Sequence, residues 1–353
     1  MDRRVMRFAI AALLALGSLL GSGASARHSD GATGIGTLSS QSPGAEPEGL
    51  ERAQSLLRDG DVAGADKAAR EFLTHHADSA EGHFLLGYIL FRKMQAHGTN
   101  PSTLNYAANE SETEFREANA KESLAEFTAG ARYHDPSAFD LKIVAFDYIL
   151  LDDSKDADKW LTRATELDPK DSDIWYNLGR TKYTENRFQE AIHAFEECLK
   201  LDPKNVKAED NLGLSYYGLG RTDDALKAYK TAIEWQSQAA EKDAQPFIDL
   251  GTLYIEKNQP KEALPYLEQA MQIAPGDAKG HEELGKAHSA LNDLPKAQSE
   301  FEKAVTLAPN VARLHYMLGQ VYRREGMIDK AKEQFARVAE LNGTHSSEDK
   351  PID

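Results

Sequence analysis

The sequence contains almost no cysteine: Cys198 is the only one among 353 residues. A lone cysteine cannot close a disulfide bond within the chain, so the fold has to be stabilised by burial of apolar side chains. Positive charge is also scarce, because 41 lysine and arginine residues face 57 aspartate and glutamate residues and leave a formal net charge of -16. A protein that wraps a nucleic acid backbone carries the opposite excess, so we expect no nucleic acid partner.

The N-terminus lacks an apolar run long enough to cross a bilayer, but it has the three-part composition of a secretory signal. Three arginines within residues 1–7 precede an apolar run over residues 8–20, and an Ala-x-Ala cleavage site ends at Ala26. The run has about 13 residues, whereas a membrane-spanning helix needs about 20. We therefore expect residues 1–26 to be a cleaved signal peptide and the protein to be periplasmic or secreted, with no stable membrane span. The alternative is a membrane tether formed by an uncleaved N-terminal segment.

The segment after the expected cleavage site differs from the rest of the chain. Residues 27–45 are rich in Gly, Ser, Ala and Pro and have almost no large apolar side chains. Such a segment cannot offset the entropy cost of ordering, so we expect a flexible linker. The whole chain is 41% hydrophobic and 28% charged, which is the balance of a folded, soluble protein.

The remaining sequence repeats itself with a period close to 34 residues. Leu-Gly pairs recur at spacings of 34, 38, 34 and 34 residues, at Leu178-Gly179, Leu212-Gly213, Leu250-Gly251, Leu284-Gly285 and Leu318-Gly319. An alanine stands twelve residues after each glycine, and a bulky side chain follows four residues later, as at Ala191 and Phe195. Proline closes several units, at Pro169, Pro203, Pro275 and Pro309. This pattern resembles the tetratricopeptide repeat (TPR) family.

The resemblance implies an all-α fold, a right-handed α-solenoid of about eight helix-turn-helix repeats over residues 46–341. The units are expected to start near residues 46, 80, 138, 172, 206, 244, 278 and 312. Glycine or alanine at the contact points lets two helices approach closely, and proline ends the second helix of a unit. Each unit leaves an apolar flank that only its neighbour covers, so stability is shared between neighbours.

Two segments depart from the repeat. Gly87 and Ser123 lie 36 residues apart where 12 is usual, so residues 95–118 are expected to be an insertion between the two helices of the second unit. Residues 342–353, after the last unit, are expected to be a disordered tail.

Patterns of catalytic, cofactor-binding and metal-binding residues do not emerge from the sequence. His281 and Glu282 begin like the helix of a zinc peptidase, but Gly285 stands where the second histidine would have to be. Cys198 occupies a small-residue packing position and is expected to be a buried, inert thiol. We therefore expect no enzyme activity, no cofactor and no metal site.

In the resembled family, the first helix of each unit lines a concave groove that holds a peptide or a partner helix. The family's register places twelve candidate groove residues in this chain, namely Tyr176, Asn177, Arg180, Tyr183, Lys207, Asn211, Tyr217, Lys279, Lys286, Arg313, Tyr316 and Arg323. In the last five units the lining has six basic residues against three acidic ones, which favours acidic peptides. A surplus of this size also lies within the ordinary scatter of charges on helix surfaces.

These features together predict a non-catalytic interaction scaffold or assembly factor of the cell envelope. It would bind peptides or partner proteins in its groove. The alternative is an accessory or substrate-positioning subunit of an envelope enzyme complex, for example with a peptidase or a glycosyltransferase. The sequence names neither the partner nor the face that binds it.

Overall fold

The computed structural model describes residues 48–97 and 110–346. The expected signal peptide at 1–26 and the expected linker at 27–45 lie outside the described residues, and so do residues 98–109 of the expected insertion. In the described part of the chain every regular element is an α-helix. None of these described helices is both long enough and apolar enough to span a bilayer.

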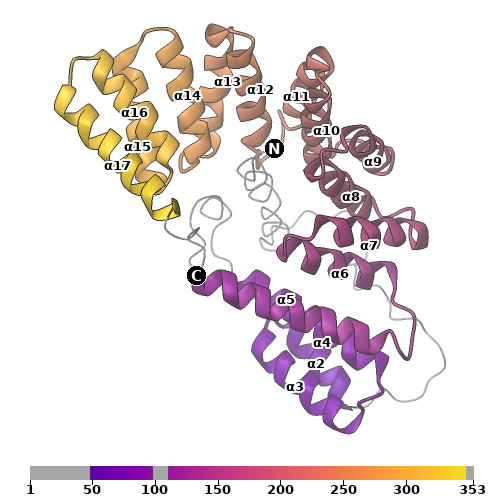
Figure 1. The fold of residues 1–353 in the computed structure, drawn as a ribbon. Coiled ribbons are helices and arrows are strands. Elements are labelled where there is room, and N and C mark those ends of the chain that lie inside the picture. The colour runs from indigo at the N-terminus through magenta and orange to yellow at the C-terminus, as the bar shows by residue number, and fades with distance from the viewer. Residues whose placement is uncertain (1–47, 98–109, 347–353) are drawn as a thin grey trace. The chain divides into compact units, whose positions relative to one another are not determined.

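The described helices follow one another in pairs, one pair for each repeat. The pairs fall into two compact parts of four pairs each, which are called unit 1 and unit 2 from here on. Figure 1 shows the paired helices of each unit. Unit 1 contains α2 (Glu48–Arg58), α3 (Val62–His75), α4 (Ala80–His97), α5 (Glu110–Gly130), α6 (Ala138–Leu150), α7 (Ser154–Leu167), α8 (Ser172–Thr184) and α9 (Phe188–Leu201). Unit 2 contains α10 (Val206–Gly218), α11 (Thr222–Trp235), α12 (Gln245–Glu256), α13 (Pro260–Ile273), α14 (Ala278–Ala290), α15 (Leu294–Leu307), α16 (Ala312–Arg324) and α17 (Ile328–Ser346).

In six of the eight described pairs the first helix carries a glycine where it meets the second helix, and α2 and α6 carry Ala53 and Ala145 there. In unit 1, a Cβ atom added to Gly179 of α8 would lie 2.6 Å from the Phe195 ring of α9. In unit 2, a Cβ added to Gly285 of α14 would lie 2.9 Å from the Phe301 ring of α15. Phe195 and Phe301 are both buried, so neither ring has room to withdraw. Only glycine permits this spacing, because packed interiors leave no space for an extra methyl group.

The short turns inside the pairs share one backbone feature. Each contains a single residue with φ between 57° and 83°, and these residues are Gly60, Asp152, Asn186, Gly220, Asn258, Asn292 and Gly326. Glycine, asparagine and aspartate are the residues that adopt this left-handed conformation at least cost. The sequence carries this signal too, because such a residue stands seven residues after the glycine of the Leu-Gly pair, as at Gly179 and Asn186.

Successive pairs within a unit pack through the second helix of one pair and the first helix of the next. In unit 1, Leu161 of α7 and Ile174 of α8 belong to one buried apolar cluster. In unit 2, α12 contacts both α10 and α14 as well as its own partner α13. First helices therefore lie beside first helices within a unit, and their outer residues share one face.

Two helix ends differ from the expected boundaries of the departing segments. Helix α4 continues to His97 and α5 begins at Glu110, so both described ends of the expected insertion at 95–118 are helical. Helix α17 continues to Ser346, into the segment expected to be a tail. No proline stands between Ile328 and Lys350, and a helix without a proline or a strong cap has no fixed stop.

The glycine contact leads to a stability prediction for unit 2. We expect Gly285→Val to lower the free energy of unfolding by about 2–4 kcal/mol, because the new side chain overpacks against the Phe301 ring. The same substitution at Gly276, an exposed turn residue with no atom within 4 Å of an added Cβ, is expected to change it by less than about 0.5 kcal/mol. Urea unfolding followed by circular dichroism measures both, and equal losses would contradict the steric account.

Candidate partner-binding face

The candidate residues of unit 1 all lie on α8, and three of the four are buried. Tyr176, Asn177 and Arg180 are between 1% and 9% exposed, and Tyr183 is half-buried. The Asn177 side-chain amide donates to the Asp173 carbonyl oxygen at 2.7 Å, and the Arg180 guanidinium lies 5.5 Å from the centre of the Tyr176 ring. These contacts hold the side chains against their own helix.

The remaining candidates belong to unit 2, on α10, α14 and α16. We call the outer residues of the first helices of this unit the first-helix face, and define it by Lys207, Asp210, Asn211, Tyr217, Asp249, Lys279, Glu282, Glu283, Lys286, Arg313, Tyr316 and Arg323. Its exposed members are Tyr217, Arg313, Tyr316 and Arg323. Asn211 is partly buried, and its amide donates to the Lys207 carbonyl oxygen at 2.8 Å.

Three of the predicted groove cations form ion pairs with two buried carboxylates. Lys286 lies 2.6 Å from Glu282 and 2.8 Å from Glu283, Arg313 of α16 lies 2.6 Å from Glu282, and Lys279 pairs with Glu283. Glu282 and Glu283 are 0% and 1% exposed. The cluster therefore carries three positive charges against two negative ones. The surplus of cations inferred from the sequence is mostly neutralised within the chain itself.

The pKa values in this cluster follow from the balance between burial and charge. Burial alone would raise the pKa of Glu283, but the ammonium groups of Lys279 and Lys286 outweigh it and lower that pKa below its ordinary value. Burial likewise works against the charge on Lys279, but Glu283 and Glu282 raise the pKa of Lys279. All members of the cluster with a shifted pKa are thus held in their charged forms.

The opposite situation holds between α10 and α12, where two carboxyl groups face each other. Asp210 is 3% exposed, and burial together with the charges of Asp249 and Asp243 raises its pKa well above the ordinary value. Burial also raises the pKa of Asp249, to about 7. A proton shared between the two carboxyl groups relieves the repulsion between their charges. Sequence spacing alone does not indicate this pair, because Asp210 and Asp249 lie 39 residues apart on different helices.

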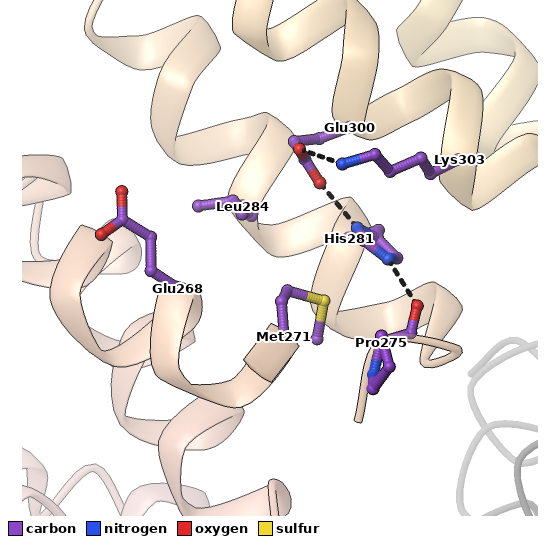
Figure 2. A pocket seen from close by; sticks show the side chains of 7 residues that line it. All are labelled: Glu268, Met271, Pro275, His281, Leu284, Glu300 and Lys303. Atoms are coloured by element: carbon purple, nitrogen blue, oxygen red, sulfur yellow. Dashed lines mark hydrogen bonds and ion pairs between the residues drawn. The ribbon is translucent and has the colours of Figure 1, made fainter. Parts of the chain in front are cut away.

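Unit 2 also has an open pocket of about 380 Å³ between α13, α14 and α15. Figure 2 shows the His281 ring at its wall, with Nδ1 2.6 Å from Glu300 and Nε2 3.0 Å from the Pro275 carbonyl oxygen. Glu300 also accepts from Lys303 at 2.8 Å. The ring thus joins the turn that enters the pair to the second helix of the same pair.

The contact between a ring nitrogen and the proline carbonyl oxygen of the preceding turn recurs at the matching position of other pairs. His315 contacts Gln334 at 2.7 Å and the Pro309 carbonyl oxygen at 2.9 Å, and the Trp175 ring N–H donates to the Pro169 carbonyl oxygen at 3.0 Å. Because it recurs with different ring types and different partners, we interpret this contact as a tie that fixes the turn between successive pairs. The wall of the pocket in Figure 2 is one copy of that tie.

Family models of the tetratricopeptide repeat match residues 172–205, 206–276 and 254–302, and one further model matches both 50–95 and 282–344. Together these matches cover most of α2 to α4 and all helices from α8 to α17 except the end of the last. The chain belongs to the tetratricopeptide repeat family. The resemblance inferred from the Leu-Gly, alanine and proline spacing is therefore confirmed, and so is the all-α repeat fold.

Two solved TPR structures illustrate the likeness. PilF of Pseudomonas aeruginosa is 18% identical, and the match covers 58% of this chain and 91% of that one with a TM-score of 0.52. PilW, described as a widely conserved type IV pilus biogenesis factor, is 18% identical, with coverage of 57% and 91% and a TM-score of 0.52. At this identity the likeness shows the fold. The comparison with curated proteins gave no match.

Membership in the TPR family places this chain among folds that act as protein interaction scaffolds. Cys198 is buried within α9, as expected for a packing position. Within residues 48–97 and 110–346, no three His, Cys, Asp or Glu side chains are grouped so that they would hold a metal ion. His281 makes its contacts with Glu300 and Pro275, and its neighbour Glu282 belongs to the ion-pair cluster.

The His281 tie predicts a pH-dependent contribution to stability. Burial opposes the charge on the ring, but the Glu300 carboxylate and the Pro275 carbonyl outweigh it and hold the pKa of His281 above its ordinary value. Stability from this group is therefore complete below about pH 6.5, the ordinary value, and is lost as the pH rises through the folded-state pKa. We expect His281→Phe to cost about 1–3 kcal/mol at about pH 5.5 and clearly less at about pH 8.5.

His315→Phe is the matched control, because His315 makes the same two contacts but with the neutral Gln334. Its cost should change less between the two pH values. Urea midpoints at both values measure the effect, and a loss at His281 that is independent of pH would contradict a charged tie.

Proposed function

We propose that this TPR protein is an exported, non-catalytic interaction scaffold or assembly factor of the cell envelope, which binds partner polypeptides on its first-helix face. The observation that carries the proposal is the concentration of charged and aromatic side chains on that face of unit 2, where four first helices contribute to it. Stacked helix pairs create extended surfaces of this kind, and repeat proteins use them for binding.

The accessible part of the face supports a polypeptide ligand. Tyr217 and Tyr316 are 41% and 49% exposed, although large aromatic side chains are usually buried. Tyrosine rings supply wide contact area at low entropy cost and are enriched among residues that dominate binding energies. Arg323 is exposed next to Tyr322 on the same helix, and the ion-pair cluster has a surplus of one positive charge. This end of the face therefore favours acidic segments of the partner.

Export is part of the proposal and rests on the composition of residues 1–26. We expect N-terminal sequencing of the protein recovered from its native cell to begin at Arg27, because the Ala-x-Ala site ends at Ala26. A mature chain that still begins at Met1 and fractionates with membranes would instead favour the uncleaved tether.

Partner binding on the first-helix face is tested by capture from a native envelope extract. We expect the triple variant Tyr217→Ala, Tyr316→Ala, Arg323→Ala to retain less than about one-thirtieth of the partner that the unchanged protein captures. A side chain that becomes buried at the centre of an interface contributes about 2 kcal/mol or more to the binding free energy. Lys286 and Arg313 are left in place, because removing either would leave a buried carboxylate without its partner.

The control variant is Lys296→Ala, Leu307→Ala, Lys332→Ala, which removes three exposed side chains from the second helices α15 and α17. It should capture the partner as well as the unchanged protein. Equal loss in both variants, or no loss in either, would refute binding on the first-helix face. Mass spectrometry of the captured chains also separates a scaffold from an accessory subunit, since a catalytic chain as the main partner would favour the latter.

A further inference from the structure

The ion-pair cluster shows how the chain neutralises a buried carboxylate on the first-helix face. Glu282 stands two residues before the leucine of its Leu-Gly pair. It forms ion pairs with Lys286 of its own helix and with Arg313 of the next first helix. Both cations lie 2.6 Å from the carboxylate. A carboxylate with no exposure needs such partners, because leaving it unpaired costs several kcal/mol.

Asp210 stands at the same position of its repeat, two residues before the leucine of Leu212-Gly213. The residues that match the two cations are Leu214 on its own helix and Gln245 on the next first helix. Neither carries a charge. Asp210 Oδ1 is buried, and no donor of the described chain reaches it.

Asp249 is the second carboxyl group and the more open side of the pair, since it is only half-buried. Gln245 donates from Nε2 to both Asp249 oxygens at 3.0 Å, which supplies hydrogen bonds but no positive charge. Asp243, in the turn before α12, adds a further negative charge, and Lys279 of α14 is the cation whose charge acts on Asp249. Lys279 is itself paired with Glu283.

We propose that the Asp210–Asp249 pair is a subsite for the cationic side chain, arginine or lysine, of a polypeptide bound on the first-helix face. The incoming cation takes the place that Lys286 and Arg313 take at Glu282. This inference rests on the proposed function, because it names the chemistry that one part of the same face recognises. The face of unit 2 then accepts a positive group at α10 and α12 and an acidic segment at α16.

The subsite couples binding to a proton. Before binding, the shared proton leaves the pair with one negative charge in place of two, and the pKa of Asp249 is about 7. A cation stabilises the doubly ionised pair and displaces that proton to solvent. Asp243 and Lys279 are the other charged groups that act on the pair. Binding is therefore expected to tighten between about pH 6 and pH 8 by up to about tenfold per pH unit below the pKa.

The experiment is calorimetric titration of the full mature chain with the peptide acetyl-Ala-Ser-Arg-Ser-Ala-amide. The control peptide carries citrulline, a neutral near-isostere, in place of arginine. At about pH 8 we expect the arginine peptide to bind at least about tenfold more tightly than the citrulline peptide. Titrations at about pH 7 in two buffers of different ionisation enthalpy should show release of a proton on binding.

Asp249→Asn and Asp210→Asn are expected to abolish both the preference for arginine and the proton release. Each keeps the side-chain volume, and circular dichroism verifies that the helices remain. Asp223→Asn is the matched control on the second helix α11, where the carboxylate is fully exposed, and it should behave as the unchanged protein.

Equal affinity for the two peptides, no binding of either at millimolar concentration, or a preference that survives in Asp249→Asn would each overturn the proposal. Tight binding of Mg²⁺ alone that Asp249→Asn removes would also overturn it, in favour of a metal cation. If capture of the native partner depends on Tyr217 and Tyr316 but not on Asp249, the proposed function stands and only the cationic subsite is lost.

Discussion

In six of the eight described pairs, the contact between a glycine on the first helix and a ring or leucine on the second sets the distance between the two helices, and the packing of successive pairs depends on it. At Gly285 the Phe301 ring occupies the volume that a Cβ would need. The close approach leaves the outer flanks of the pair for its neighbours, so Leu250 and Leu267 share one cluster with residues of adjacent pairs. Helix spacing, and not any single apolar residue, determines where the next pair can pack.

That packing brings first helices side by side, and their polar residues meet across short distances. Arg313 and Glu282 are 31 residues apart in sequence, yet their charged atoms lie 2.6 Å apart. In low-dielectric surroundings such groups interact more strongly than on an open helix surface. The face therefore cannot be treated as a sum of independent surface charges, because each buried carboxylate requires a cation or a proton.

The fold could be predicted from sequence because its determinants are local and periodic. Leu178-Gly179, Ala191 and Phe195 identify one repeat by sterics alone, and Asn186 at the tight turn carried a further signal that the spacing analysis did not use. The chemistry of the face could be predicted only in part. Lys286 lies four residues after Glu282, so that pair is readable from helix geometry. The pairing of Asp210 with Asp249 requires the stacking of α10 on α12, which a count of lining charges does not supply.

The two halves of the first-helix face of unit 2 resolve the same energetic problem differently. Around Glu282 and Glu283 the chain brings its own cations, and an added ligand would have to displace hydrogen-bonded charges from buried partners, at a cost of several kcal/mol. Around Asp210 and Asp249 no cation of the described chain forms an ion pair, and burial raises the pKa of both carboxyl groups. The ion-pair cluster is suited to hold α14 and α16 in place, whereas a protonated carboxyl pair can change its charge. In the proposed function, α10 and α12 would therefore accept a cationic side chain and the exposed end of α16 an acidic segment, while the ion-pair cluster keeps the two helices between which it lies rigid.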